Sequence, residues 1–425
     1  MSIGIILIGV FAVFMLAGVP IAIALSFSAI VTVLFSDSFT ATAIIHRMIG
    51  SANSYTLLAI PFFILAAKLM NTGSITRRIF RAAAAWVGAI PGGLGHANVV
   101  ASIIFSGMSG SAVADAGGLG QVEMQAMEEE GFDPEFSAAV TVASATVGPI
   151  IPPSVPMVVY GMMAEVSVGA LFMGGFIPGL LLGFTTMVLI FFMSKKRNYP
   201  KHTFSIKEVF VSTKEALLSL LTPIIIIGGI WGGIFSPTEA AVVAVGYSFI
   251  LSVLVYKELG LKAVWNELKS AAIDSATILF IITGAASFSW LVAMMGITNS
   301  IANWMITLTS NKYLILLFLN IVFLVLGMFM EALSVLTITV PFLIPLMSAY
   351  NIDPIHLGVV VVLNLMIGLA TPPVGTSLFI CARQAKIPIE KMYKAILPFL
   401  VPLLIVLFAI TYFPQLVLWL PNMMM

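Results

Sequence analysis

Two stretches of the sequence combine glycine and proline in a way that would open a helix and expose backbone oxygen atoms. The first runs from Gly148 to Pro156 and the second from Gly368 to Gly375. Proline has no N–H group, so each interior proline leaves the carbonyl four residues earlier without its helical partner. The carbonyls released in this way belong to Ala145, Gly148, Pro149 and Pro152 in the first stretch, and to Gly368 and Leu369 in the second. Such carbonyls are hard oxygen ligands that suit a cation such as Na+.

Two further segments, 93–127 and 312–347, each read as a pair of half-helices that meet at a tip. The tips, at 106–111 and 326–331, would bring more oxygen atoms to the two breaks, and we expect two similar Na+ sites. Site 1 would use Ser106, Ser109, Gly148, Ile151 and Pro153, and site 2 would use Gly327, Gly368, Thr371 and Val374. In the alternative interpretation the prolines only kink their helices.

Polar side chains near the same breaks predict a place for an anionic solute. Half-helix N-termini expose unpaired N–H groups that attract a carboxylate, and an ionisable residue in an apolar segment is costly enough to suggest function. The candidates for substrate binding are Ser109, Ser111, Ser154, Glu331, Asn364 and Asp115, with Thr376 and Ser377 as further donors. For any single serine, helix capping is an equally good explanation, and Asp115 could instead stabilise its own helix. Asp274, Glu239 and Glu165 are expected near the membrane surfaces without an assigned role.

The composition shows what kind of molecule must position these residues. Of 425 residues, 60% are hydrophobic and 9% are charged, and the mean hydropathy is +1.12. A soluble chain is about a quarter charged, so this composition excludes a soluble enzyme, and the net charge of +1 excludes a nucleic-acid partner. Apolar stretches of about 20 residues indicate membrane-spanning helices rather than barrel strands. We therefore expect an all-α polytopic membrane protein in the lipid bilayer.

About ten spans are expected besides the two hairpins. Lipid offers the backbone no hydrogen bonds, so the hairpin tips must be buried in protein or line a wet cavity. Segments 74–91 and 298–310 would lie along the interface. The expected spans are 3–18, 20–36, 53–70, a broken span 136–166, 169–193, 216–235, 238–256, 272–295, a broken span 355–385, and 395–420.

The basic residues predict the orientation. If the polar segment 194–215 is cytoplasmic, 17 of the 19 lysines and arginines fall on the cytoplasmic side, and only Arg47 and Lys312 fall outside. This bias is what the positive-inside rule requires. Both termini would then face the periplasm, and the two hairpins would open to opposite sides.

The two halves of the chain match each other at one constant offset in the numbering. Gly107-Met108 aligns with Gly327-Met328, and Gly148 with Pro152-Pro153 aligns with Gly368 with Pro372-Pro373. Five spans in each half would make the second copy inverted, and broken helices at matching positions point to a transporter's binding site. We expect a first repeat at 1–193, a cytoplasmic linker at 194–215 and a second repeat at 216–425. A duplication that now serves only structure is the alternative.

No sequence pattern indicates an enzyme, since Gly-x-Ser-x-Gly, His-Glu-x-x-His and Walker A motifs are all absent. Three motifs together instead resemble the large membrane subunit of tripartite ATP-independent periplasmic (TRAP) transporters. They are Ser106-Gly-Met-Ser-Gly-Ser-Ala-Val-Ala-Asp115, Gly148-Pro-Ile-Ile-Pro-Pro-Ser154 and Ala370-Thr-Pro-Pro-Val-Gly375. The likeness covers essentially the whole chain.

The resemblance implies a bacterial inner-membrane importer that couples Na+ to an organic acid such as sialic acid, a C4-dicarboxylate or a sugar acid. It also implies a small four-helix membrane subunit and a periplasmic substrate-binding protein as partners. The hairpins and broken spans would form a transport domain that moves as an elevator against a scaffold of the other spans. A self-sufficient dicarboxylate carrier, and a channel or non-transporting scaffold, are the competing hypotheses.

Overall fold

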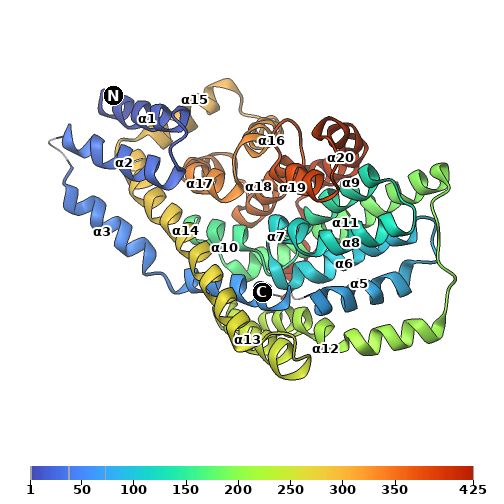
Figure 1. The fold of residues 1–425 in the computed structure, drawn as a ribbon. Helices are drawn as coiled ribbons and strands as arrows, with labels where there is room; N and C mark the ends of the chain where they lie inside the picture. The colour runs from blue at the N-terminus through green and yellow to red at the C-terminus, as the bar shows by residue number, and fades with distance from the viewer. Residues whose placement is uncertain (1, 37–38, 72, 425) are drawn as a thin grey trace.

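The computed structural model describes residues 2–36, 39–71 and 73–424, and no strand occurs in them (Figure 1). The expectation of an all-α chain is therefore confirmed. The first half contains α1 Ser2–Leu16, α2 Ile21–Leu34, α3 Ala41–Ala52, η1 Tyr55–Leu58, α4 Ala59–Met70, α5 Gly73–Val87, α6 Gly93–Ser109, α7 Ala112–Gly117, α8 Leu119–Glu129, α9 Pro134–Ala145, α10 Val155–Met163 and α11 Val168–Arg197. The second half contains α12 Ile206–Trp231, α13 Pro237–Phe249, η2 Ile250–Val255, α14 Leu261–Met294, α15 Ile297–Leu308, α16 Lys312–Phe329, α17 Ala332–Tyr350, α18 Pro354–Leu369, α19 Thr376–Gln384, α20 Ile389–Tyr412 and α21 Gln415–Met424.

The long apolar helices account for most of the expected unbroken spans and for both arms of the second hairpin. Among the described residues, seven helices are long and apolar enough to cross a bilayer. The pair α3 with η1–α4, bent by 52°, makes an eighth if it is counted as one span. Helices α1, α2 and α18 are apolar but shorter. At 1.5 Å per residue, a 14-residue helix is about 21 Å long, whereas the hydrocarbon core is about 30 Å thick. The seven are α11, α12, α13 with η2, α14, α16, α17 and α20.

Both segments expected to form hairpins contain two helical arms that meet at a short tip. In the first, Gly110 ends α6 with a left-handed φ of 60°, a conformation that glycine adopts at no steric cost. The Ser111 side chain then accepts a hydrogen bond from the Ala114 N–H and starts the return arm, α7 and α8. In the second, the Glu331 carboxylate accepts from the Ser334 N–H and starts α17.

Two other helix pairs are interrupted where glycine and proline cluster. Residues 146–154 separate α9 from α10, and residues 370–375 separate α18 from α19. Each break contains one cis peptide bond, Pro152-Pro153 in the first and Pro372-Pro373 in the second. The two halves therefore place the same backbone feature at equivalent positions.

The repeat extends beyond the breaks. Helices α9 and α18 begin at Pro134 and Pro354, each after an aspartate, and each packs against the first arm of its own hairpin, α6 or α16. The segments that begin at Ala41 and Leu261 differ, since the first is bent between α3 and α4 whereas α14 is one continuous helix. The two halves are thus related but not identical.

Helices extend into both ends of the segment 194–215, which was expected to link the two halves. Helix α11 continues to Arg197 and ends at Asn198, which has a left-handed φ of 53°. The Ser205 hydroxyl caps the start of α12 by accepting from the Glu208 N–H, so only residues 198–205 of this segment are non-helical. Arg81 of α5 then binds Glu208 at 2.8 Å and Glu215 at 2.7 Å, which ties α12 to the first half.

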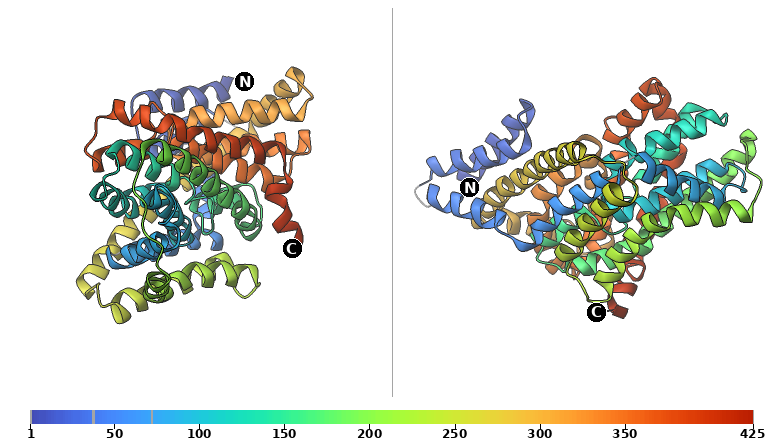
Figure 2. Two further views of the ribbon diagram at one scale, coloured as in Figure 1. Left: turned by 90° about the vertical axis from the view of Figure 1, so that its right-hand side faces the viewer. Right: turned by 60° about the horizontal axis from the view of Figure 1, so that its bottom comes forward.

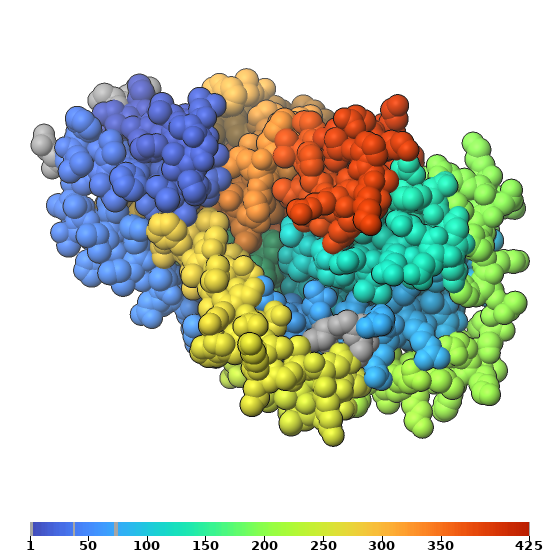
Figure 3. All heavy atoms as spheres, viewed as in Figure 1, coloured from blue at the N-terminus to red at the C-terminus, as the bar shows by residue number. Residues whose placement is uncertain are grey.

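The helices pack around two apolar cores. The larger core includes both hairpins, both broken helices, α11 and α20. The smaller one joins α1 and α2 to α14 through side chains such as Leu7, Leu25 and Phe288. In the right-hand view of Figure 2 the N-terminal helices project from the rest of the molecule, and Figure 3 shows α14 (yellow) on the surface beside the N-terminal segment (blue).

Candidate functional site

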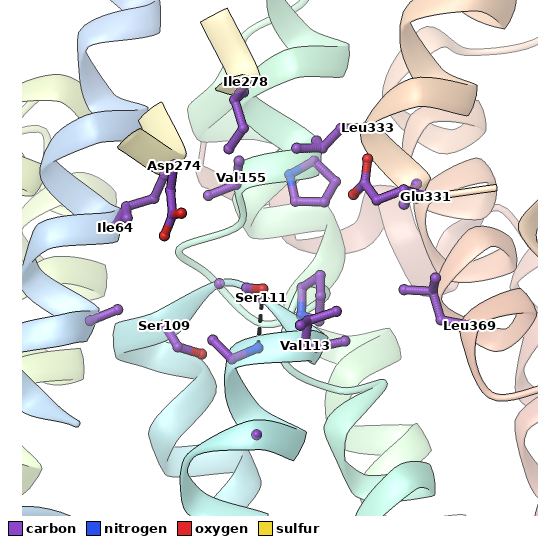
Figure 4. Close-up of a pocket in the computed structure, with 18 of the residues that line it drawn as sticks. Ile64, Ser109, Ser111, Val113, Val155, Asp274, Ile278, Glu331, Leu333 and Leu369 are labelled. Carbon is purple, nitrogen blue, oxygen red and sulfur yellow. Dashed lines mark hydrogen bonds between the residues drawn. The ribbon is translucent and has the colours of Figure 1, made fainter. Parts of the chain in front are cut away.

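A cavity of about 680 Å³ lies where the two hairpin tips face α4 and α14 (Figure 4). The first tip contributes residues 109–114, and the second contributes residues 331–334. Pro149 and Val155 of the first broken helix and Leu369 of the second complete that side. The cavity therefore joins elements from both repeats, as a binding site between repeats requires.

The three serines predicted to bind substrate occupy different places. Ser109 and Ser111 both line the cavity, and the Ser111 hydroxyl accepts from the Ala114 N–H at 3.4 Å. The buried Ser154 does not line it, and its hydroxyl accepts from the Met157 N–H at 3.2 Å to cap α10. Ser111 thus both caps a helix and faces the cavity, whereas Ser154 acts in capping.

Glu331 combines helix capping with a place in the cavity wall. Its carboxylate accepts from the Ser334 N–H at 3.2 Å, and Figure 4 shows it across the cavity from Asp274. A carboxylate at a helix N-terminus offsets the positive end of the helix dipole. The second tip therefore places a carboxyl group in the cavity wall.

We expect Glu331→Gln to change substrate handling more than assembly. Glutamine keeps an acceptor oxygen for the Ser334 N–H, so the cap survives while the charge is removed. The KM for uptake of an organic acid should change severalfold, while the yield and melting temperature of the purified protein stay near wild type. An unchanged KM would remove Glu331 from the site.

Asn364 and Asp115 lie outside the cavity wall. The buried Asn364 amide donates to the Asn320 side-chain oxygen at 2.9 Å, and Asn320 donates in turn to Thr411 at 3.0 Å. The first repeat has a matching contact, in which Asn98 accepts from Ser144 at 2.6 Å. Ser144 and Asn364 occupy equivalent positions of the two repeats, so these contacts fasten each broken helix to its own hairpin.

We expect Asn320→Ala to destabilise the protein modestly, because it removes both of these hydrogen bonds in the second repeat. Polar contacts between membrane helices average about 0.6 kcal/mol and reach about 1.7 kcal/mol. The melting temperature in detergent should fall by a few degrees. Equal stability of Asn320→Ala and wild type would show that the contact does not hold the hairpin.

The residues predicted for site 1 lie around the contact between the first tip and the first break. A β-carbon added to Gly110 would lie 2.5 Å from the Pro153 carbonyl oxygen, so the tip backbone packs directly on the break. A β-carbon on Gly148 would lie 3.5 Å from Asp115 Oδ2. Ser109 is buried next to Gly110. The Ser106 hydroxyl donates to the Ile103 carbonyl at 2.6 Å. The Ile151 side chain packs against α11 at Gly179.

The residues predicted for site 2 lie around an equivalent contact. A β-carbon on Gly368 would lie 2.6 Å from backbone atoms of Gly327, and the Gly375 N–H donates to the Met328 carbonyl at 3.1 Å. The Thr371 hydroxyl donates to the Ile367 carbonyl at 2.6 Å, which leaves its oxygen lone pairs free to accept. Val374 is 38% exposed at the edge of the break. Each tip therefore packs closely against its own broken helix.

Comparison with known proteins identifies the family. Residues 8–416 match the family described as the tripartite ATP-independent periplasmic transporter, DctM component. The chain belongs to this family. It is therefore a large subunit of a TRAP transporter rather than an enzyme, as the sequence motifs indicated.

Two relatives match this TRAP permease over nearly its whole length. It is 45% identical to the sialic acid TRAP transporter large permease protein SiaM of Vibrio cholerae over 410 residues, which are 96% of each chain. It is 38% identical to the C4-dicarboxylate TRAP transporter large permease protein DctM of the same species, over 97% of this chain and 96% of that one. The names of these relatives thus refer to different acids.

A solved transporter shares the fold of this TRAP permease. The crystal structure of YdaH from Alcanivorax borkumensis superimposes with a TM-score of 0.60 and covers 88% of this chain and 87% of its own. The sequences are 15% identical. The likeness therefore concerns the helical architecture.

Two charged residues of the TRAP permease line the cavity although no sequence pattern assigned them a role. They are Lys68 of α4 and Asp274 of α14, which form an ion pair at 2.8 Å. Asp274 was expected near a membrane surface. Its position inside an apolar stretch of α14 is the signal that could have marked it, because membrane helices rarely carry unpaired acids.

Proposed function

We propose that this protein imports an organic acid across the bacterial inner membrane by Na+-coupled secondary transport. The main support for this proposal is the cavity between two hairpin tips, each of which packs closely against its own broken helix. The transport domain would consist of both hairpins and both broken spans, and it would move as an elevator against the remaining helices. The family and its relatives support the transport of an acid.

The charges of the cavity support coupling to a cation. Among the described residues, its lining contains one basic side chain, Lys68, and two acidic ones, Asp274 and Glu331. This sums to a formal charge of −1, which would repel an anionic solute. Cations bound at the breaks would supply the missing positive charge, together with the N-terminus of α10 that faces the cavity.

Backbone oxygens gather where each cation would sit. In the second break, the carbonyl oxygens of Leu369 and Thr371 both lie 2.8 Å from the position of a β-carbon on Gly375. Beside the first break, Asp115 of α7 is 2% exposed and forms no ion pair with a basic side chain in the described residues. A buried carboxylate is costly unless it is paired, so Asp115 is proposed as a charge partner of a cation at site 1.

The packing supports a moving domain. The faces of α4 and α14 toward the cavity are formed mainly by Ile64, Ala67, Thr277, Ile278 and Ile281. Few hydrogen bonds would have to break if the tips slid along such faces. Helices α1 and α2, by contrast, are held to α14 by their own core and would belong to the stationary scaffold.

The proposed orientation follows the positive-inside rule. It places both termini in the periplasm and residues 194–215 in the cytoplasm. A small four-helix membrane subunit and a periplasmic substrate-binding protein are proposed as partners, as the word tripartite in the family description indicates. The relatives' names support sialic acid or a C4-dicarboxylate as the solute.

Uptake of labelled acids into proteoliposomes tests this function and identifies the transported acid. Radiolabelled sialic acid and succinate would be offered to vesicles that contain this chain with or without the small subunit, and with or without the binding protein. We expect saturable uptake of one acid only when all three proteins are present. Uptake by this chain alone would make it a self-sufficient carrier, and an ohmic current without substrate would make it a channel.

A further inference from the structure

The scaffold side of the cavity is built from one stripe on each of two helices. Helix α4 with its C-terminal end contributes Ile64, Ala67, Lys68 and Asn71, and α14 contributes Asp274, Thr277, Ile278 and Ile281. Both sets follow the spacing i, i+3, i+4, i+7, which places all four side chains on one helix face. Only Lys68 and Asp274 are charged among these eight, so a solute that touches this wall meets a single ion pair in a largely apolar surface.

The ammonium of Lys68 is held without using all of its donors. It lies 2.8 Å from Asp274 Oδ2, and it donates to the Ser270 hydroxyl at 2.6 Å. A lysine ammonium has three N–H donors, so these two contacts leave one through which an entering carboxylate can engage before it displaces Asp274. The Lys68 side chain is 25% exposed and that of Asp274 is 51% exposed, so water and solutes reach the pair.

Among the described residues that line the cavity, Lys68 is also the one basic residue. The opposite wall contains hydroxyl groups and the Glu331 carboxylate, and Figure 4 shows Asp274 and Glu331 on opposite sides of the space. A carboxylate-bearing solute would therefore find hydroxyl donors on the tips and the Lys68 ammonium on the scaffold. The carboxylate of the solute has the same chemistry as the Asp274 side chain, which is paired with the Lys68 ammonium in this structure.

We propose that Lys68 is the scaffold-side anchor for the carboxylate of the transported acid, and that Asp274 forms an ion pair with the Lys68 ammonium when the cavity is empty. This inference rests on the proposed function. An entering carboxylate would displace Asp274 from Lys68 and keep the amine paired throughout. Because Lys68 lies on α4 rather than on a hairpin, this contact forms only while the tips face α4 and α14.

A purely structural ion pair between α4 and α14 makes a different prediction. Removing either partner would then weaken the same contact, and Lys68→Met and Asp274→Asn would have effects of the same sign. If Asp274 competes with the substrate for Lys68, the signs are opposite. Lys68→Met removes the anchor and weakens binding, whereas Asp274→Asn removes the competitor and strengthens it.

The test is equilibrium binding of radiolabelled sialic acid or succinate, whichever the wild type transports, to the purified full-length chain in lipid nanodiscs with Na+. We expect Lys68→Met to raise the Kd about tenfold, the low end for a hydrogen bond to a charged group, and Asp274→Asn to lower it. Lys68→Arg should recover part of the affinity. The uncharged methyl ester of the same acid should bind wild type and Lys68→Met equally.

Lys269→Met is the matched control, because Lys269 lies beside Ser270 on α14 but stacks on Trp265 outside the cavity lining. Its Kd should equal that of the wild type. Equal Kd values for Lys68→Met and wild type, a raised Kd in Asp274→Asn, or no binding by a wild type that transports the acid would each overturn the anchor. A wild type that transports no acid at all would instead overturn the proposed function, and the anchor with it.

Discussion

Replacing Gly368 by alanine should reduce Na+-dependent uptake by between about fivefold and about 150-fold, because overpacking costs about 1–3 kcal/mol and 1.4 kcal/mol is about tenfold. The added β-carbon would lie 2.6 Å from backbone atoms of Gly327. Backbone cannot rotate away as a flexible side chain can, so the second tip must move off its break. The measurement is the initial rate of uptake in proteoliposomes at saturating Na+.

Gly246→Ala is the control for this variant. Gly246 lies in α13, where a β-carbon would meet nothing within 4 Å, so the substitution tests helix composition without closing a contact. Its uptake should match the wild type. If Gly368→Ala also transported at the wild-type rate, close contact between tip and break would not be needed for transport.

Thr371→Val should make uptake need much more Na+. Valine has nearly the same shape but lacks the hydroxyl, whose oxygen retains acceptor capacity while its hydrogen is donated to Ile367. Losing one of the few oxygen ligands of a cation should raise the Na+ concentration for half-maximal uptake at least tenfold, or abolish uptake. The measurement is the initial rate of uptake as a function of external Na+ at constant ionic strength.

Thr339→Val provides the matched control, because the Thr339 hydroxyl also donates to the carbonyl four residues earlier, at 2.7 Å, but within the continuous helix α17. Loss of that bond should leave the Na+ dependence unchanged. Equal Na+ activation in Thr371→Val and wild type would argue against site 2 as proposed.

Glycine, proline and serine in the sequence predicted the architecture of the site well, because these residues act on the backbone. A left-handed residue at Gly110 or a missing N–H at Pro372 determines where a helix must stop, whatever surrounds it. The matching pattern in the two halves then indicated which tip belongs to which break. The family resemblance drawn from the same motifs is confirmed.

Side-chain partners across the fold were harder to predict. Asn364 lies one turn before the second break, and sequence distance suggested a place in the pocket, but its amide faces Asn320 of another helix. Lys68 and Asp274 belong to different halves of the chain and meet only because α4 packs on α14.

The most direct test of Na+-coupled import is the sodium dependence of uptake by this chain reconstituted with the small subunit and the binding protein. Vesicles would receive the labelled acid with an inward Na+ gradient, with equal Na+ on both sides, or with choline in place of Na+. Na+ coupling predicts accumulation above equilibrium only with the inward gradient and uptake near background in choline. Equal uptake in Na+ and choline would contradict Na+ coupling, and with it the roles given to both breaks.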